Sequence, residues 1–357
     1  MNCPFFEHKA NFNPVPKKNS DCSFYQFKET FSLENGGQIA EPVIAYHTYG
    51  TLNESRDNVI YICHALTANS DAEDWWHGLF GKGDIFDWDK YFIICANNLG
   101  SPYGSSSPKQ IDPNSGEKYG MDFPFFTLRD TAKLHIKLLE YLKISSIKLL
   151  IGGSGGGNIC QELAYLWNDQ VKNMALLCCS AKETPWVIGI HESQRIVLRT
   201  DPTLGKKMKD AGAAGLKACR AAALPFYRTH ASFKVRQHEH DLNKMSDFRA
   251  SSYINYQGDK FVKRFDPHCY YHLLNALDTH NMGRGRKGIE KALSEIKANT
   301  IVIGFDSDLL IPKVEQQFIS RHIPNATYVE IKTLFGHDGF LIETDDISRS
   351  IRNVLSL

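Results

Sequence analysis

The chain has 357 residues, enough for one large domain or two small ones. Its apolar content of 42%, charged content of 23% and net charge of +1 are ordinary for a globular protein, and they argue against a nucleic-acid-binding or membrane-surface protein. The sequence contains no run of about 18 apolar residues, so we expect no transmembrane helix. The first residues lack the basic and apolar regions of a secretory signal.

The predicted elements alternate between strands and helices along the chain. Residues 1–22 are polar and marked by prolines, so we expect a loose arm, and strands are predicted over Ser23–Leu33 and Val43–Tyr49. Short apolar runs flanked by turns follow, which is typical of strands buried on both faces of a parallel sheet. A helical pattern over Leu128–Leu142 separates two of them. These runs lie at 58–66, 91–98, 147–153, 171–181, 299–308 and within 326–340.

This alternation predicts an α/β fold with a mostly parallel, doubly wound sheet. Residues 184–298 interrupt it, because they are rich in Lys, Arg, His and helix formers and lack buried-strand runs. We therefore expect a core over 23–183 and 299–357 with a helical lid inserted at 184–298. Four of the nine cysteines, Cys63, Cys95, Cys178 and Cys179, lie in apolar runs, which favours reduced, buried thiols in a cytoplasmic protein.

The glycine-rich turn at 152–157 fails the phosphate-binding patterns and fits a nucleophile elbow. A dinucleotide fingerprint fails at Asn158 or Cys160, and a Walker-type loop would need Lys where Asn158 stands. The segment 152–156, GGSGG, matches G-x-S-x-G between an apolar strand and a helix. The pattern predicts Ser154 as a nucleophile; a purely structural glycine turn is the alternative.

A nucleophilic serine needs a base that an acid orients, and in this architecture the order is Ser, acid, His. Asp306 and Asp308 follow one late strand, and His337 follows the next, flanked by glycines. We predict Ser154, Asp308 and His337 as the triad; the alternative for either aspartate is capping a helix that starts near Pro312. The oxyanion hole is expected to use the backbone N–H of Gly155 and, from the loop after an early strand, that of Leu66.

The motifs together resemble the homoserine O-acetyltransferase family, acyltransferases of methionine biosynthesis with the α/β-hydrolase fold. The resemblance runs from about Phe31 to Glu343. It is carried by IAYHTYGTLN, CHALTANSD, YFIICANNLGS, YGSSSP, YGMDFPFFTLRD, the elbow, YINYQGDKFVKRFD, ALDTHNMGRGR, SDLLIP and FGHDGFLIE. Two of these strings, YQGDKFV and THNMGRGR, lie in the expected insertion, which ordinary hydrolases have no reason to share.

The resemblance implies a two-step reaction, in which Ser154 takes an acetyl group from acetyl-CoA and passes it to the hydroxyl of L-homoserine. It implies that Arg228 holds the carboxylate of the amino acid and Asp338 its ammonium group. A forked guanidinium suits a carboxylate. The resemblance further implies a homodimer that uses acetyl-CoA as co-substrate and holds no bound cofactor.

Two positions depart from the family pattern. The residue after the nucleophile is commonly methionine, whereas here it is Gly155; Asn281 stands where aspartate is common. The missing side chain leaves the acyl and acceptor preference open. Transfer of succinyl from succinyl-CoA, serine as acceptor, hydrolysis by an esterase and a non-catalytic binding protein are the alternatives.

Other conspicuous residues favour structural roles. The pair His238 and His240 lacks a third ligand, so we expect a solvated polar stretch and no metal site. The basic run 283–287, GRGRK, is compatible with binding the phosphates of CoA or with a structural turn. Trp75 and Trp76 are expected in the core or at an interface.

Overall fold

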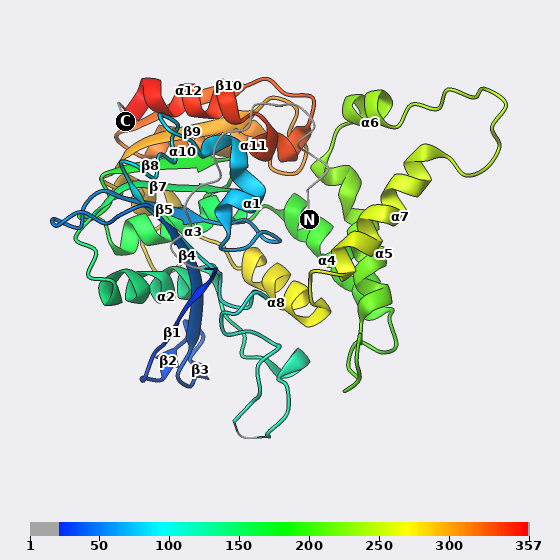
Figure 1. Ribbon diagram of the computed structural model, residues 1–357, viewed down its shortest axis with the longest axis horizontal. Coiled ribbons are helices and arrows are strands. Elements are labelled where there is room, and N and C mark those ends of the chain that lie inside the picture. The colour runs from blue at the N-terminus through cyan, green and yellow to red at the C-terminus, as the bar shows by residue number, and fades with distance from the viewer. Residues whose placement is uncertain (1–20, 114, 356–357) are drawn as a thin grey trace.

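A computed structural model of the chain describes residues 21–113 and 115–355, so nearly all of the arm predicted at 1–22 lies outside the described residues. The centre of the fold is an eight-stranded sheet in the order β1-β4-β6-β5-β7-β8-β9-β10 (Figure 1). β4 is antiparallel to β1 and β6, and the remaining neighbours are parallel, which confirms the predicted fold class. The strands are β1 (Ser23–Gln26), β4 (Val43–Tyr49), β5 (Val59–Cys63), β6 (Phe92–Ala96), β7 (Ile147–Gly153), β8 (Asn173–Leu177), β9 (Asn299–Phe305) and β10 (Ala326–Ile331).

The central parallel strands are buried on both faces, as their unbroken apolar sequences predict. In β5, Val59, Tyr61 and Cys63 join one core cluster, and Ile60 and Ile62 join the other. α2, α3 and α10 pack on the first cluster, and α1 and α12 on the second, so helices cover both faces of the sheet. The bounds are α1 (Ala72–Trp76), α2 (Leu128–Tyr141), α3 (Gly155–Leu166), α10 (Lys313–His322), α11 (Gly339–Ile342) and α12 (Thr344–Leu355); short 3₁₀ turns cover His77–Leu79, Gly120–Asp122 and Gly336–Asp338.

One predicted strand is wrong in extent. The segment Ser23–Leu33 is not a single strand, because β1 ends at Gln26 and the chain bends at the polar residues Lys28 and Glu29. The following residues form β2 (Phe31–Ser32), which pairs with β3 (Gln38–Ile39) in a separate two-stranded sheet.

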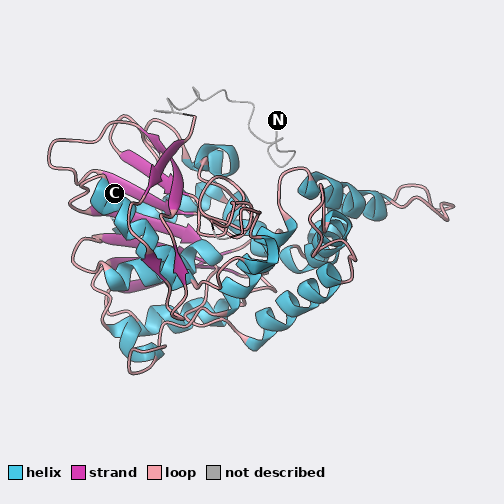
Figure 2. Cartoon of the chain, turned by 90° about the horizontal axis from the view of Figure 1, so that it is seen from below, coloured by secondary structure: helices cyan, strands magenta, loops and turns pink. Residues whose placement is uncertain are grey.

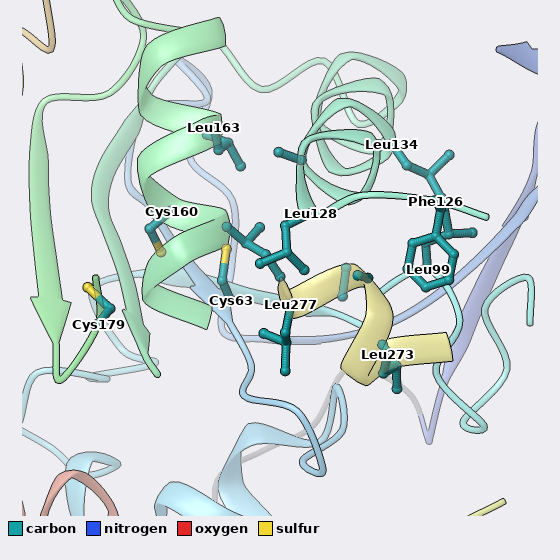
Figure 3. Packing of buried hydrophobic residues seen from close by; sticks show 14 of the residues in the cluster. Cys63, Leu99, Phe126, Leu128, Leu134, Cys160, Leu163, Cys179, Leu273 and Leu277 are labelled. Atoms are coloured by element: carbon teal, nitrogen blue, oxygen red, sulfur yellow. The ribbon is translucent and has the colours of Figure 1, made fainter. Parts of the chain in front are cut away.

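Residues 184–298, between β8 and β9, are built of six helices; those up to residue 262 lie beyond one end of the sheet (Figure 2), whereas the last of the six packs against α10. α8 contributes apolar side chains to the first core cluster, where they pack with residues of α2 and α3 (Figure 3). The helical segment therefore shares its core with the sheet layers. Its helices are α4 (Pro185–Arg199), α5 (Ala213–Tyr227), α6 (His230–Arg236), α7 (Arg249–Val262), α8 (Pro267–Asp278) and α9 (Ile289–Ser294).

An ion network, largely buried, fastens the C-terminal part of this helical segment to the sheet layers. Glu162 on α3 accepts hydrogen bonds from Arg129 of α2 and from Arg286, which follows α8. Glu34 pairs with Arg129 and with Arg284. Arg284 and Arg286 belong to the basic run at 283–287. Because both arginines pair with carboxylates of the chain itself, the structure favours the structural role for this run.

The described cysteines are eight free thiols, and all of them except Cys22 are buried. Burial raises the pKa of six of the buried thiols, for Cys219 to about 12, which keeps these thiols protonated at neutral pH; the six are Cys95, Cys160, Cys178, Cys179, Cys219 and Cys269. None of the described helices has both the length and the apolar character needed to cross a membrane.

Candidate active site

Ser154 lies in a sharp turn between β7 and α3. Its backbone angles are φ 56° and ψ −130°, and its N–H donates to the carbonyl of Leu177 on the next strand. The flanking glycines are sterically required, because a Cβ on Gly152 would lie 2.5 Å from the carbonyl carbon of Gly156, and one on Gly156 would lie 2.0 Å from the oxygen of Cys63. The turn therefore has the strained strand-to-helix geometry of the predicted elbow.

The structure brings Ser154, His337 and Asp308 into one hydrogen-bonded chain. His337 Nε2 is 2.8 Å from Ser154 Oγ, and His337 Nδ1 is 2.7 Å from Asp308 Oδ2. The other oxygen of Asp308 accepts the N–H groups of Leu310 and Ile311, so this aspartate also caps the turn ahead of α10.

Asp306, the other sequence candidate, lies elsewhere: its carboxylate accepts the N–H of Thr333. An ionised carboxylate only accepts, so the proton on His337 sits on Nδ1. Nε2 then carries no proton and can accept the hydroxyl proton of Ser154. A general base requires this tautomer.

The electrostatics of His337 reflect two opposing influences. Burial lowers the pKa of His337, but the charge and hydrogen bond of Asp308, with help from Asp338 and Glu183, outweigh it, and the pKa lies above the ordinary value of 6.5. The base must be neutral to act. Activity should therefore be lost, as the pH falls, already above pH 6.5.

We expect the acidic limb of kcat/KM to show this upward displacement. A neutral ester such as p-nitrophenyl acetate is the suitable substrate, because its hydrolysis reports acylation of the free enzyme without titration of an amino-acid substrate. A limb centred at or below pH 6.5 would contradict the electrostatic role of Asp308.

The two predicted oxyanion-hole donors lie next to each other. A Cβ built on Gly155 would be 4.0 Å from the backbone nitrogen of Leu66. Gly155 is also the first residue of α3, whose N-terminus favours negative charge. The loop of Leu66 is held by the buried His64, whose Nε2 accepts the N–H of Asn98 and whose Nδ1 bonds the carbonyl of Ala65. Burial lowers the pKa of His64 to about 4, so it stays neutral and keeps both bonds at neutral pH.

The predicted substrate-binding residues meet each other directly. Arg228 follows α5, and its Nε is 2.7 Å from Asp338 Oδ2; the two side chains are 4% and 17% exposed. Asp338 adjoins His337 in sequence, so the pair lies beside the base. Arg228 also lines a cavity of about 290 Å³, together with Ser232, Phe233, Arg236, Gln237 and Tyr253.

Cys178 adds a thiol that the sequence did not assign to the site. Its Sγ, a carboxylate oxygen of Asp308 and a ring nitrogen of His337 all lie within 4.8 Å of one another. Such a set has ligand types that suit Zn²⁺. Here, however, Asp308 and His337 bond each other, and burial raises the pKa of Cys178 well above its ordinary value, so the thiol stays protonated and is a poor metal ligand.

Sequence reasoning missed the residues that position the site from a distance. Trp76, expected only in the core or at an interface, is fully buried and donates from Nε1 to the carbonyl of Phe340, just after the His337 turn. His64 and Cys178 were visible as polar residues in or beside apolar strands, which is the signal that marks them. Asn98 is 34 positions from His64, and His337 is 159 positions from Cys178, so only the fold reveals these contacts.

Comparison with known proteins agrees with this geometry. A family model described as the alpha/beta hydrolase fold matches residues 58–344. A protein of Cyclobacterium marinum named homoserine O-acetyltransferase is 41% identical over 326 residues, covering 91% of this chain and 93% of the relative. One of the same name from Nostoc punctiforme is 40% identical over 337 residues, covering 92% and 94%.

Solved structures give the same fold. The homoserine O-acetyltransferase from Bacillus anthracis superposes with a TM-score of 0.87 at 25% identity, covering 96% of this chain and 98% of that one. Esterase E22 superposes with a TM-score of 0.86 at 23% identity, covering 94% and 99%, and this likeness concerns the fold alone. On the strength of the curated relatives, the chain belongs to the homoserine O-acetyltransferase family, as its motifs predicted.

Proposed function

We propose that the chain transfers an acetyl group from acetyl-CoA to the hydroxyl of L-homoserine, a step of methionine biosynthesis. Ser154 attacks the thioester while His337 takes its proton; the C–S bond breaks, and CoA leaves as the thiol with that proton. The homoserine hydroxyl then attacks the acetyl-serine ester, losing its proton to His337, and Ser154 regains a proton as O-acetyl-L-homoserine leaves. The N–H groups of Gly155 and Leu66 stabilise the oxyanion in both steps.

The observation that carries transfer rather than hydrolysis is the pair Arg228–Asp338 beside His337. A guanidinium and a carboxylate side by side match the carboxylate and ammonium groups of an amino acid, each of which finds the opposite charge. A simple ester offers neither group. An esterase would have no use for this pair at the base.

The charge distribution supports a polyanionic donor. Residues 184–298 contain 20 Lys and Arg against 11 Asp and Glu, a net charge of +9, whereas the rest of the chain contains 21 against 29, a net charge of −8. A positive field of this kind steers anions toward one part of a molecule. The phosphates of acetyl-CoA fit it, and we propose that residues 184–298 act as a lid over the site.

The deciding assay offers acetyl-CoA or succinyl-CoA to the purified protein with homoserine, serine or no amino acid. Release of the CoA thiol is followed, and the product is identified by mass. O-acetylhomoserine formed only with both substrates supports the proposal. Equal CoA release without an amino acid would mean a hydrolase, and faster turnover with succinyl-CoA or serine would select one of the related transferases.

The variant Arg228→Lys should weaken binding of homoserine. Lysine keeps the charge but loses the fork that holds a carboxylate, so the KM for homoserine should rise roughly tenfold or more. The rate at which Ser154 is acetylated should change little, because that step does not involve the amino acid. Steady-state kinetics and a single-turnover acylation assay separate the two.

A matched control for this variant is Arg199→Lys, an exposed arginine of α4 that pairs with Glu192. It should leave the KM for homoserine unchanged. An equal loss of acylation and transfer in Arg228→Lys would argue against a role in holding the acceptor.

We further propose a cytoplasmic homodimer. The exposed Trp186 and Ile196 of α4 support an interface there, since large apolar side chains are enriched at such surfaces. Trp186 also borders a shallow apolar groove with Gly189, Ile190 and Phe226. Light scattering of the full chain and of Trp186→Asp tests the assembly.

A further inference from the structure

A leucine from the helical segment lies where a side chain of the residue after the nucleophile would be. A Cβ built on Gly155 would be 2.7 Å from Cδ2 of Leu277, closer than real Cβ contacts come. Leu277 is near the C-terminal end of α8 and only 7% exposed. The first residue of α3, Gly155, has no side chain, and Leu277 of α8 places apolar atoms at that point instead.

This methyl group borders the position of the acyl group. The same Cβ position on Gly155 is 4.0 Å from the nitrogen of Leu66, and these two residues are the donors proposed for the acyl oxygen. An acyl group on Ser154 that points its oxygen at both N–H groups lies beside the Leu277 methyl. Because Gly155 has no side chain, the apolar boundary on this side comes from Leu277.

We infer that Leu277 is a specificity-determining residue that limits the length of the acyl chain accepted by Ser154. The inference rests on the proposed acyl-enzyme, and it extends the proposed function by naming the side chain that favours acetyl over longer acyl groups. One extra methylene in an apolar pocket changes kcat/KM by roughly 10- to 200-fold. A single leucine side chain is therefore enough to set such a preference.

The test compares acetyl-CoA with butyryl-CoA as donors to homoserine, in the full chain and in Leu277→Ala. The ratio of kcat/KM for butyryl to acetyl should rise about tenfold or more in the variant. Leu273→Ala is the matched control, because Leu273 lies one turn earlier on α8 and is also buried, at 3% exposed (Figure 3). Both substitutions remove the same apolar volume from a core. Leu273 is not among the side chains nearest Gly155, so its loss should leave the ratio within about twofold.

Two further variants keep the inference falsifiable if Leu277→Ala is poorly stable. Leu277→Val should shift the ratio in the same direction by a smaller factor. Gly155→Ala should lower acetyl transfer several-fold by displacing the Leu277 methyl, and adding Leu277→Ala to it should restore the activity, because the clash then disappears.

An unchanged butyryl-to-acetyl ratio in active Leu277→Ala and Leu277→Val would overturn the inference. Repeating the comparison with p-nitrophenyl acetate and butyrate, which need no amino-acid acceptor, separates it from the proposed function. A shifted ester ratio without homoserine acetylation would support the role of Leu277 in acyl-chain length and contradict homoserine as the acceptor. Normal homoserine acetylation with unshifted ratios would reject Leu277 alone.

Discussion

Ser154→Ala is expected to lower acetyl transfer by at least about 10⁴-fold, because removing a triad nucleophile abolishes the covalent route and leaves only binding and the oxyanion hole. Folding should be preserved, since alanine is no more strained than serine in this backbone conformation and the lost hydroxyl is hydrogen-bonded to the side chain of His337. Transfer is measured as O-acetylhomoserine formed, and intact mass reports the acetyl-enzyme. The acetyl adduct expected on the parent chain should be missing from the variant.

Ser180→Ala is the matched control. Ser180 is fully buried just after β8, and among the described side chains its Oγ has no hydrogen-bond partner, so its loss should cost little activity. A Ser154→Ala chain that keeps more than about a hundredth of the activity would contradict the covalent mechanism, since triad knock-outs cost far more.

Glu162→Gln is expected to destabilise the fold by about 3–5 kcal/mol. Its carboxylate is 1% exposed and pairs with Arg129 and Arg286, whose side chains are 10% and 7% exposed. The neutral amide would leave two largely buried guanidinium groups without a shared counter-ion. The change is measured as the shift in the urea midpoint of unfolding, with one common dependence of the free energy of unfolding on urea concentration fitted to parent and variant.

Glu192→Gln provides the comparison on the surface. Glu192 also pairs with two arginines, Arg195 and Arg199, but it is 43% exposed. Exposed pairs contribute at most about 1 kcal/mol, so this variant should unfold close to the parent midpoint. Equal losses in the two variants would mean that burial of the network does not govern its contribution.

The sequence predicted the parts of the site that depend on local patterns. The elbow around Ser154 is a contiguous strand–turn–helix signal, and Asp308 and His337 each follow a late apolar strand. Parallel strands end at the same edge of a sheet, so residues that each follow such a strand are expected to lie close together. The same logic placed Leu66 beside Gly155.

What the sequence left open depends on contacts between distant segments. Glu34 and Arg284 are 250 positions apart. No local pattern in the sequence indicated whether the basic run at 283–287 binds a phosphate or a carboxylate. The sequence of α8 likewise contains no signal that Leu277 lies against Gly155. The strand predicted over Ser23–Leu33 was too long, because apolar residues on both sides of Lys28 and Glu29 hid a bend at a pair of polar residues.

The backbone of Ser154 has a consequence for how stability is distributed in this chain. Its φ of 56° lies in a region that glycine adopts freely and that costs other residues on the order of 1–3 kcal/mol. Selection for stability alone would favour a further glycine in the turn at 152–157, which already contains five. Under the proposed mechanism, Ser154 is therefore a point where catalysis opposes folding, and the packed layers on either side of the sheet supply the free energy that keeps this serine in its unfavourable conformation.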